Sequence, residues 1–133
     1  MLERNVIQSS GFSNRGPAGG RTGFRVRLRQ PNYRGMRLSL VEGVDVTVDG
    51  VNFPATTNSV VLRGREYTRD ALDALEETRW HVGEAIDVLI DHPGGLEPGV
   101  HRVETIVWMR HPYFPPQFRP VPMRDSQHVT IIV

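Results

Sequence analysis

The sequence contains no cysteine and no lysine, and each absence removes a class of chemistry. Without cysteine, neither disulfides nor thiolate groups can stabilise the fold or carry out a reaction. All 16 basic residues are arginine, whose planar guanidinium favours hydrogen-bonded contacts at interfaces. A net charge of +1 provides no general attraction to nucleic acids or to anionic membranes.

Long apolar runs are also missing. No run approaches the ~20 residues that a helix needs to cross a bilayer. The first residues lack the apolar core and the cleavage site of a secretory signal, so we expect a soluble, cytoplasmic protein. A chain of 133 residues is the size of one domain, and we expect a single domain over residues 1–133.

Residues 36–48 carry an apolar side chain at every even position except Glu42. This period of two is typical of a half-buried β-strand, because successive side chains point to opposite faces of the sheet. A continuous strand of this length would span roughly 43 Å, with Glu42-Gly43 as the place for a bend or bulge. Asp49-Gly50, which follows, predicts a tight hairpin turn.

Shorter strands are predicted at residues 24–29, 59–63, 66–67, 79–82, 85–90, 101–110 and 129–133, with one short helix at 69–77. A Gly/Ser-rich stretch near 9–22 and a Pro/aromatic stretch near 111–124 are predicted to be loops. This pattern indicates an all-β protein, an antiparallel β-sandwich of about 7–9 strands. Trp80 is expected to be a core residue whose indole N–H needs a partner.

Residues 24–29 place three arginines, Arg25, Arg27 and Arg29, on one face of a strand. Three interpretations stay open: a solvated face balanced by cross-strand acids such as Asp45 and Glu42, a protein interface, or a nucleic-acid track. No aromatic side chains alternate with these arginines, which weakens the nucleic-acid interpretation.

No motif for metal binding or nucleophilic catalysis is present. The five histidines (His81, His92, His101, His111 and His128) have no ligand spacing, and we interpret them as ordinary surface or loop residues. His101 and His111 flank one predicted strand and are too far apart to share a metal. No Gly-x-Ser-x-Gly motif occurs. Asp45 and Asp49 are expected to lie solvated on an outer face.

The stretch from Trp108 to Phe118 combines aromatic side chains with several prolines. Proline lowers the entropy lost when a loop docks, and aromatic rings supply apolar contact area with few torsions. Tyr113 and Phe114 could cap the core of the sandwich, or they could line an interface or a pocket; both interpretations stay open.

Seven short motifs carry a resemblance to a known family: Met1-Leu2-Glu3, Thr22-Gly23-Phe24, Pro31-Asn32-Tyr33-Arg34-Gly35, Val41-Glu42-Gly43-Val44-Asp45-Val46-Thr47-Val48-Asp49-Gly50, Thr78-Arg79-Trp80, Gly95-Leu96-Glu97-Pro98-Gly99-x-His101 and Tyr113-Phe114-Pro115. In this order and spacing, which cover roughly residues 1–115, the chain resembles the small (beta) subunit of bacterial C-glycoside deglycosidases.

The resemblance implies a heteromeric enzyme. The large (alpha) subunit of this family is an isomerase-like barrel that holds a divalent metal, usually manganese, and the catalytic base. The implied substrate is a C-glycoside of a flavonoid-type aromatic whose sugar carries a 3-ketone. The present chain would then contribute no catalytic, cofactor-binding or metal-binding residue of its own.

The same resemblance leads us to expect that this chain docks on the large subunit and lines or covers the aglycone pocket. Tyr113, Phe114 and Phe118 are assigned to aglycone or partner contact, and Arg110 and His111 to polar contact at the same edge. A second, weaker candidate contact comprises Tyr33 and Arg34.

Two alternatives remain. The chain could be a non-catalytic β-sandwich that binds carbohydrate or another protein. It could also be a self-sufficient lyase that uses His101 or His111, since a general base needs only one well-placed residue.

Overall fold

The computed structural model describes residues 6–30, 36–72, 74–75, 77–81, 83–109 and 121–131. Its strands form two main antiparallel sheets. The five-stranded sheet has the order β1 (Ile7–Arg15), β2 (Gly23–Arg29), β9 (Ala85–Asp91), β6 (Ser59–Leu62) and β7 (Arg65–Tyr67). The four-stranded sheet has the order β11 (Val121–Ile131), β10 (Gly99–Met109), β4 (Val41–Val48) and β5 (Val51–Phe53).

The smaller elements lie around these sheets. β3 (Met36–Arg37) and β8 (Arg79–Trp80) form a separate two-stranded sheet. Short helical segments are η1 (Leu38–Leu40), η2 (Ala55–Thr57) and α1 (Arg69–Leu72). Among the described residues, no helix has the length and apolar character needed to cross a bilayer.

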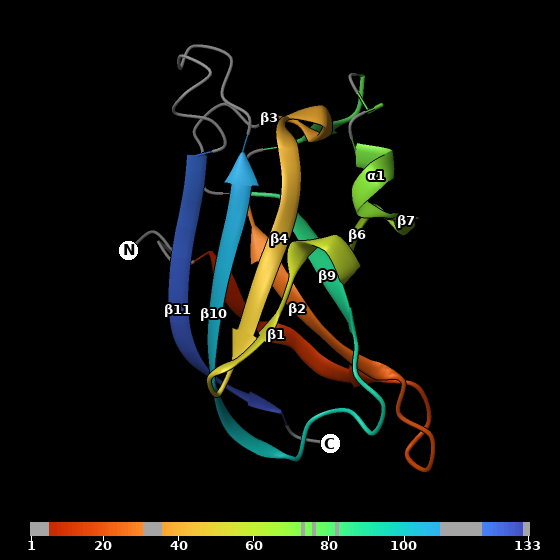
Figure 1. The fold of residues 1–133 in the computed structure, drawn as a ribbon, viewed down its shortest axis with the longest axis vertical. Coiled ribbons are helices and arrows are strands. Elements are labelled where there is room, and N and C mark those ends of the chain that lie inside the picture. Colours follow the sequence, from red (N-terminus) through yellow and green to blue (C-terminus); the bar gives the residue numbers. More distant parts are fainter. Residues whose placement is uncertain are drawn as a thin grey trace.

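The two main sheets face each other, with the four-stranded sheet in front in Figure 1. The core between them is made by the inward positions of the alternating strands, such as Val26 on β2, Val88 on β9, Val46 on β4 and Val103 on β10, each fully buried. Burying one such aliphatic side chain stabilises the fold by about 1.5–3 kcal/mol. The predicted all-β antiparallel sandwich with one short helix is confirmed.

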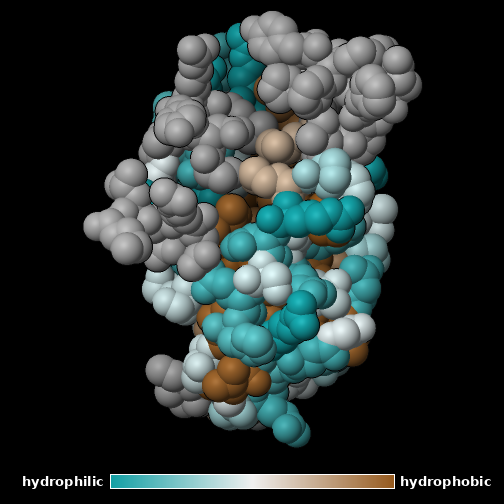
Figure 2. All heavy atoms as spheres, turned by 90° about the vertical axis from the view of Figure 1, so that its left-hand side faces the viewer, coloured by the Kyte–Doolittle hydropathy of each residue, from teal (hydrophilic) through white to brown (hydrophobic). Residues whose placement is uncertain are grey.

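Figure 2 shows the side of the molecule on which β11 lies. Hydrophilic side chains cover much of the described surface there, with smaller hydrophobic areas between them. This distribution agrees with a core that lies between the sheets rather than on their outer faces.

The expected strand over residues 36–48 is wrong in its first part. Met36 pairs with Trp80 in the small sheet, and the 3₁₀ segment η1 separates it from β4. Leu38 is nevertheless fully buried. The apolar alternation therefore predicts burial correctly at this position, although the strand is not continuous. The bulge is confirmed: Trp108 pairs with Gly43 and Met109 with Val41, which leaves Glu42 as the extra residue.

The predicted hairpin at Asp49-Gly50 is confirmed. Both residues have positive φ, 50° and 85°, as a type I′ turn requires, and Val48 pairs with Val51 across it. The indole nitrogen of Trp80, a fully buried residue, donates a hydrogen bond of 2.7 Å to the Glu84 carbonyl, which confirms the expected core role.

Both predicted loops need correction. Residues 7–15 form β1, an edge strand whose register is irregular between Gln8 and Ser13. Gly11 has a φ of +84° within this irregularity, while Ile7 and Phe12 on either side of it are buried in the core. In the second stretch, residues 111–120 lie outside the described residues, but β11 already begins at Val121 and includes Pro122. Proline is tolerated there because β11 is an edge strand.

The helix predicted at 69–77 is shorter than expected. α1 ends at Leu72, and the following described residues form single turns, with backbone bonds from Leu75 to Leu72 and from Thr78 to Leu75. Eleven strands occur among the described residues, more than the expected number, because residues 7–15 and 51–53 form strands and residues 36–48 contribute two.

Candidate functional site

The outer face of the four-stranded sheet is the surface of the described residues best suited to bind a ligand or a partner. Because side chains alternate, Val103, Val107 and the other inward residues of β10 fill the core, while Glu104, Ile106 and Trp108 point outward and are half-buried. Asp45 and Thr47 of β4 lie on one side of them, and Arg124 and Ser126 of β11 on the other. We call these seven outward residues the outer-face cluster.

Trp108 is held in place by its neighbour on β4. Its indole nitrogen donates a hydrogen bond of 2.8 Å to Oδ2 of Asp45, and Oδ1 of Asp45 accepts a bond of 2.5 Å from the backbone N–H of Ala55. The carboxylate therefore fixes both the ring and the start of η2. The expectation that Asp45 is solvated is wrong, because its two oxygens have protein donors.

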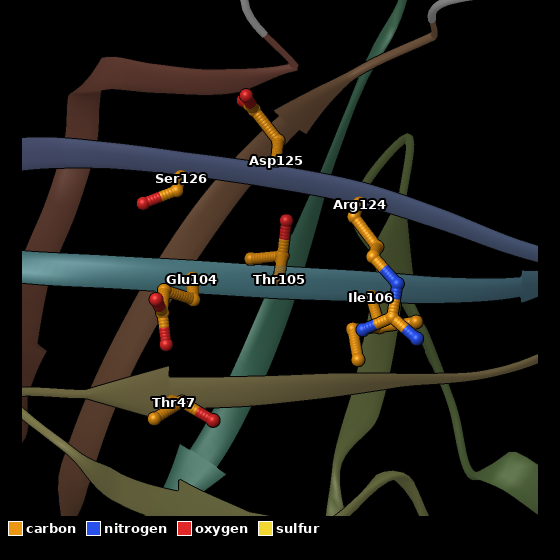
Figure 3. A pocket seen from close by; sticks show the side chains of 7 residues that line it. All are labelled: Thr47, Glu104, Thr105, Ile106, Arg124, Asp125 and Ser126. Atoms are coloured by element: carbon orange, nitrogen blue, oxygen red, sulfur yellow. The ribbon is translucent and has the colours of Figure 1, made fainter.

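A hollow of about 440 Å³ lies within this face. Outward side chains of three strands line it, namely Thr47, Glu104, Ile106, Arg124 and Ser126, and Thr105 and Asp125 complete its boundary. Figure 3 shows Arg124 reaching from β11 towards β10, with its guanidinium beside Ile106. The lining thus combines two carboxylates, one guanidinium, three hydroxyl groups and one aliphatic side chain. Of the two carboxylates, that of Asp125 already accepts the backbone N–H groups of Val6 and Ile7.

Further hydrogen bonds hold parts of the hollow in position. Glu104 forms an ion pair of 3.0 Å with Arg102. The hydroxyl of Thr47 accepts a hydrogen bond of 3.0 Å from the Asn52 amide.

The site residues predicted from the sequence lie outside the described residues. They are Tyr33 and Arg34, which fall between β2 and β3, and Arg110, His111, Tyr113, Phe114 and Phe118, which fall between β10 and β11. What the structure gives is the position of the flanking strands. Met109 pairs with Val121, so the end of β10 and the start of β11 lie side by side, at the top of Figure 1.

His101 occupies the opposite end of β10 and is not an ordinary surface histidine. Its Nδ1 lies 2.6 Å from Oδ2 of Asp49, and its Nε2 lies 2.6 Å from the carbonyl oxygen of Glu97. Oδ1 of Asp49 also accepts the backbone N–H of Arg102, so the expectation of a solvated Asp49 is wrong. Phe12 packs edge-on against the imidazole, with ring centres 6.1 Å apart.

Two acceptors at hydrogen-bond distance favour the doubly protonated imidazolium. Burial opposes the charged form, but the bonds to the Glu97 carbonyl and to Asp49 outweigh it, and the pKa of His101 is raised. The pKa of Asp49 is lowered by the hydrogen bonds from His101 and from the Arg102 backbone. Because both ring nitrogens are engaged, this geometry argues against His101 as the general base of a self-sufficient lyase.

The outer face of the five-stranded sheet carries the predicted arginines. Arg27 forms an ion pair of 2.8 Å with Asp87, which lies opposite it on β9. The acids proposed to balance these arginines, Asp45 and Glu42, are instead on β4 in the other sheet, so that part of the prediction is wrong. Whether this face binds a partner stays a prediction.

The described residues do not assemble a metal site. No group of three or more His, Asp or Glu side chains in the described ranges could hold an ion together. His101 and Asp49 bind each other and backbone groups. These residues therefore do not fit a metal, and the expected metal of the partner subunit stays a separate prediction.

Sequence reasoning missed most of the outer-face cluster. In the sequence, Trp108 stands out only as the start of the aromatic stretch, and Asp45 is predicted to be solvated. The available signal was the shared alternation of residues 41–48 and 101–110, which places both residues on outward positions. It does not give the register that brings Asp45 beside Trp108.

Comparison with known proteins gives a consistent result. The family model described as C-glycoside deglycosidase beta subunit matches residues 2–113. The chain is 31% identical over 116 residues to a C-glycoside deglycosidase beta subunit of Eubacterium cellulosolvens, covering 86% of this chain and 79% of the relative. It is 29% identical over 125 residues to a 3'-dehydrocarminate deglycosidase beta subunit of a Microbacterium species, covering 93% and 89%.

Proposed function

Because the chain belongs to the C-glycoside deglycosidase beta subunit family, we propose that it is the small subunit of a heteromeric enzyme that cleaves C-glycosides. The family description names a beta subunit and so implies another subunit in a hetero-oligomer. The observation that carries the proposal is the extent of the match, which reaches residue 113 and covers nearly every described element.

The proposed substrate is a sugar with a 3-ketone, joined through C1 to a carbon of a flavonoid-type aromatic ring. A carbon–carbon bond has no basic oxygen to protonate, so the usual two-carboxylate hydrolysis does not apply. The ketone acidifies the proton on C2. A base removes this proton, its electron pair forms the C1–C2 double bond, and the arene leaves with the electrons of the C1–aryl bond and takes up a proton. This sequence makes the enzyme a carbon–carbon lyase.

We assign the base and a divalent metal, usually manganese, to a large isomerase-like barrel subunit. The metal would stabilise negative charge beside the ketone when that proton is removed. The described residues of this chain do not form a binding site for the ion. The proposed role of this chain is therefore to shape the active site and to make contacts there.

This chain would line or cover the pocket that holds the aromatic aglycone. Residues 110–120 fall between the paired strands β10 and β11 in the sequence, and rigid sheets commonly position loops that carry function. Tyr113, Phe114 and Phe118 would contact the aglycone or the partner, and Arg110 and His111 would make polar contacts at the same edge. Tyr33 and Arg34 would form a second contact.

The test is to purify each subunit alone and both together, and to measure cleavage of a 3-keto C-glycoside. We expect activity from the mixture, none from this chain, and little from the large subunit. Full activity from the large subunit alone would contradict the proposal. Co-expression separates it from a non-catalytic binding module, because an obligate subunit should co-purify with its partner.

A further inference from the structure

The hollow in the outer-face cluster has the chemistry of a small-molecule site. Its volume of about 440 Å³ falls within the roughly 300–1,000 Å³ that is typical of ligand pockets. Its polar groups come from three neighbouring strands, which hold them at fixed spacings. Sites built on strands keep their geometry better than sites built on loops.

The polar groups that line the hollow include both donors and acceptors of hydrogen bonds. Glu104 only accepts hydrogen bonds, Arg124 only donates them, and the hydroxyls of Thr47 and Ser126 do both. A carboxylate has two oxygens with about four lone-pair sites, so the ion pair of Glu104 with Arg102 leaves acceptor capacity. The ligand must therefore present several groups that donate and accept.

The charged side chains of the hollow restrict the net charge of the ligands that it can bind. Of the two carboxylates that line the hollow, that of Asp125 is engaged by two backbone N–H groups, so Glu104 and Arg124 are the charged groups that would meet a ligand. A strongly anionic or cationic ligand would be attracted by one of them and repelled by the other. Ile106 adds an apolar side chain to the lining, and Figure 3 shows the Arg124 guanidinium beside it. A neutral molecule with a hydroxyl-bearing rim and a C–H face satisfies all of these groups.

We infer that this hollow binds a neutral saccharide ring. Hydroxyls of the ring donate to the Glu104 carboxylate and others accept from the Arg124 guanidinium, while the C–H face of the ring packs on Ile106. The inference does not depend on the proposed function, because it uses only residues of this chain that the structure describes.

The test is a titration of the isotope-labelled full chain with methyl β-glucopyranoside, followed by the backbone amide signals in NMR spectra. We expect saturable shifts at residues of β4, β10 and β11 that line the hollow, with a dissociation constant on the order of millimolar. Sorbitol, an open-chain polyol, and inorganic phosphate should shift these signals less. Absence of saturable shifts, or equal shifts with phosphate, would overturn the inference.

Two variants locate the binding. Glu104→Gln and Arg124→Ala should each weaken the binding at least about fivefold, because each removes a charge-assisted hydrogen bond. Arg65→Ala is the matched control, since Arg65 is an exposed arginine on β7 in the other sheet. Equal binding by all three variants would overturn the assignment to this hollow. Failure to form a heteromer would count against the proposed function and leave this result unaffected.

Discussion

At the scale of single residues, His101 connects three parts of the chain. It lies on β10, bonds to Asp49 in the turn between β4 and β5, and bonds to the carbonyl of Glu97 in the connection that precedes β10. Only 12% of its side chain is exposed. The imidazolium can donate to both acceptors at once, whereas the neutral ring has a single N–H and loses one of the two bonds.

This arrangement predicts a stability that depends on pH. Since the pKa of His101 is raised in the folded state, its stabilisation is fully present below about pH 6.5, the unfolded value, and is lost as the pH rises through the folded pKa. We expect the free energy of unfolding, measured with urea, to fall between pH 6 and a pH above the folded value. The fall should be smaller in His101→Gln.

The control for this measurement is His81→Gln, because His81 is exposed. It should keep the pH dependence of the original chain. Asp49 does not change the free energy of unfolding with pH in this range, since its lowered pKa affects stability only at acidic pH. If the free energy of unfolding changed equally with pH in the original chain and in His101→Gln, the bonds of His101 to Asp49 and Glu97 would not depend on protonation of the imidazole.

At the scale of elements, the sequence predicts strands well where one face is strictly apolar and the other polar. β2 and β9 are of this kind, with every inward residue from Phe24 to Leu28 and from Ile86 to Ile90 buried. Prediction fails where a strand lacks the pattern. β1 is an edge strand of irregular register that contains serine and glycine, and these residues are typical of loops.

The same limit explains why the candidate site was predicted only in part. The bond between Trp108 and Asp45 joins residues 63 positions apart in the sequence. Alternation indicates that each residue points outward, but a shift of one strand by two residues would preserve the alternation and separate the pair. The register that assembles the outer-face cluster is therefore a property of the folded sheet.

The bulge in β4 supports a specific prediction. Gly43 has φ of +154°, and a Cβ atom there would lie 2.8 Å from the Cβ of Ala55, the first residue of η2. Gly43→Ala should therefore reduce the free energy of unfolding by about 1–3 kcal/mol, because this contact cannot be relieved by a flexible side chain. Urea unfolding followed by circular dichroism measures the change.

Gly19→Ala is the matched control, since Gly19 lies in a turn and a Cβ atom there meets nothing within 4 Å. Its effect should stay within about 0.5 kcal/mol. If Gly43→Ala reduced the free energy of unfolding as little as Gly19→Ala, there would be more space between residue 43 and Ala55 than the structure indicates.

At the scale of the whole molecule, the two sheets are joined along the side where β11 meets β1. Oδ2 of Asp125 accepts the backbone N–H groups of Val6 and Ile7 at 3.0 and 2.9 Å, and Gln127 donates to the Ile7 carbonyl at 2.6 Å. These contacts join residues about 120 positions apart.

Removal of this contact should destabilise the fold as a whole. Asp125→Ala leaves two partly buried N–H groups without their acceptor, and we expect the free energy of unfolding to fall by about 1–3 kcal/mol. Asp125→Asn keeps an acceptor oxygen and should lose less. Asp91→Ala serves as the control, because it removes only an exposed ion pair with Arg15, worth about 0–1 kcal/mol. If the urea midpoint of Asp125→Ala were no lower than that of Asp91→Ala, the bonds of Asp125 to Val6 and Ile7 would make no measurable contribution to stability. The apolar core alone would then hold the two sheets together.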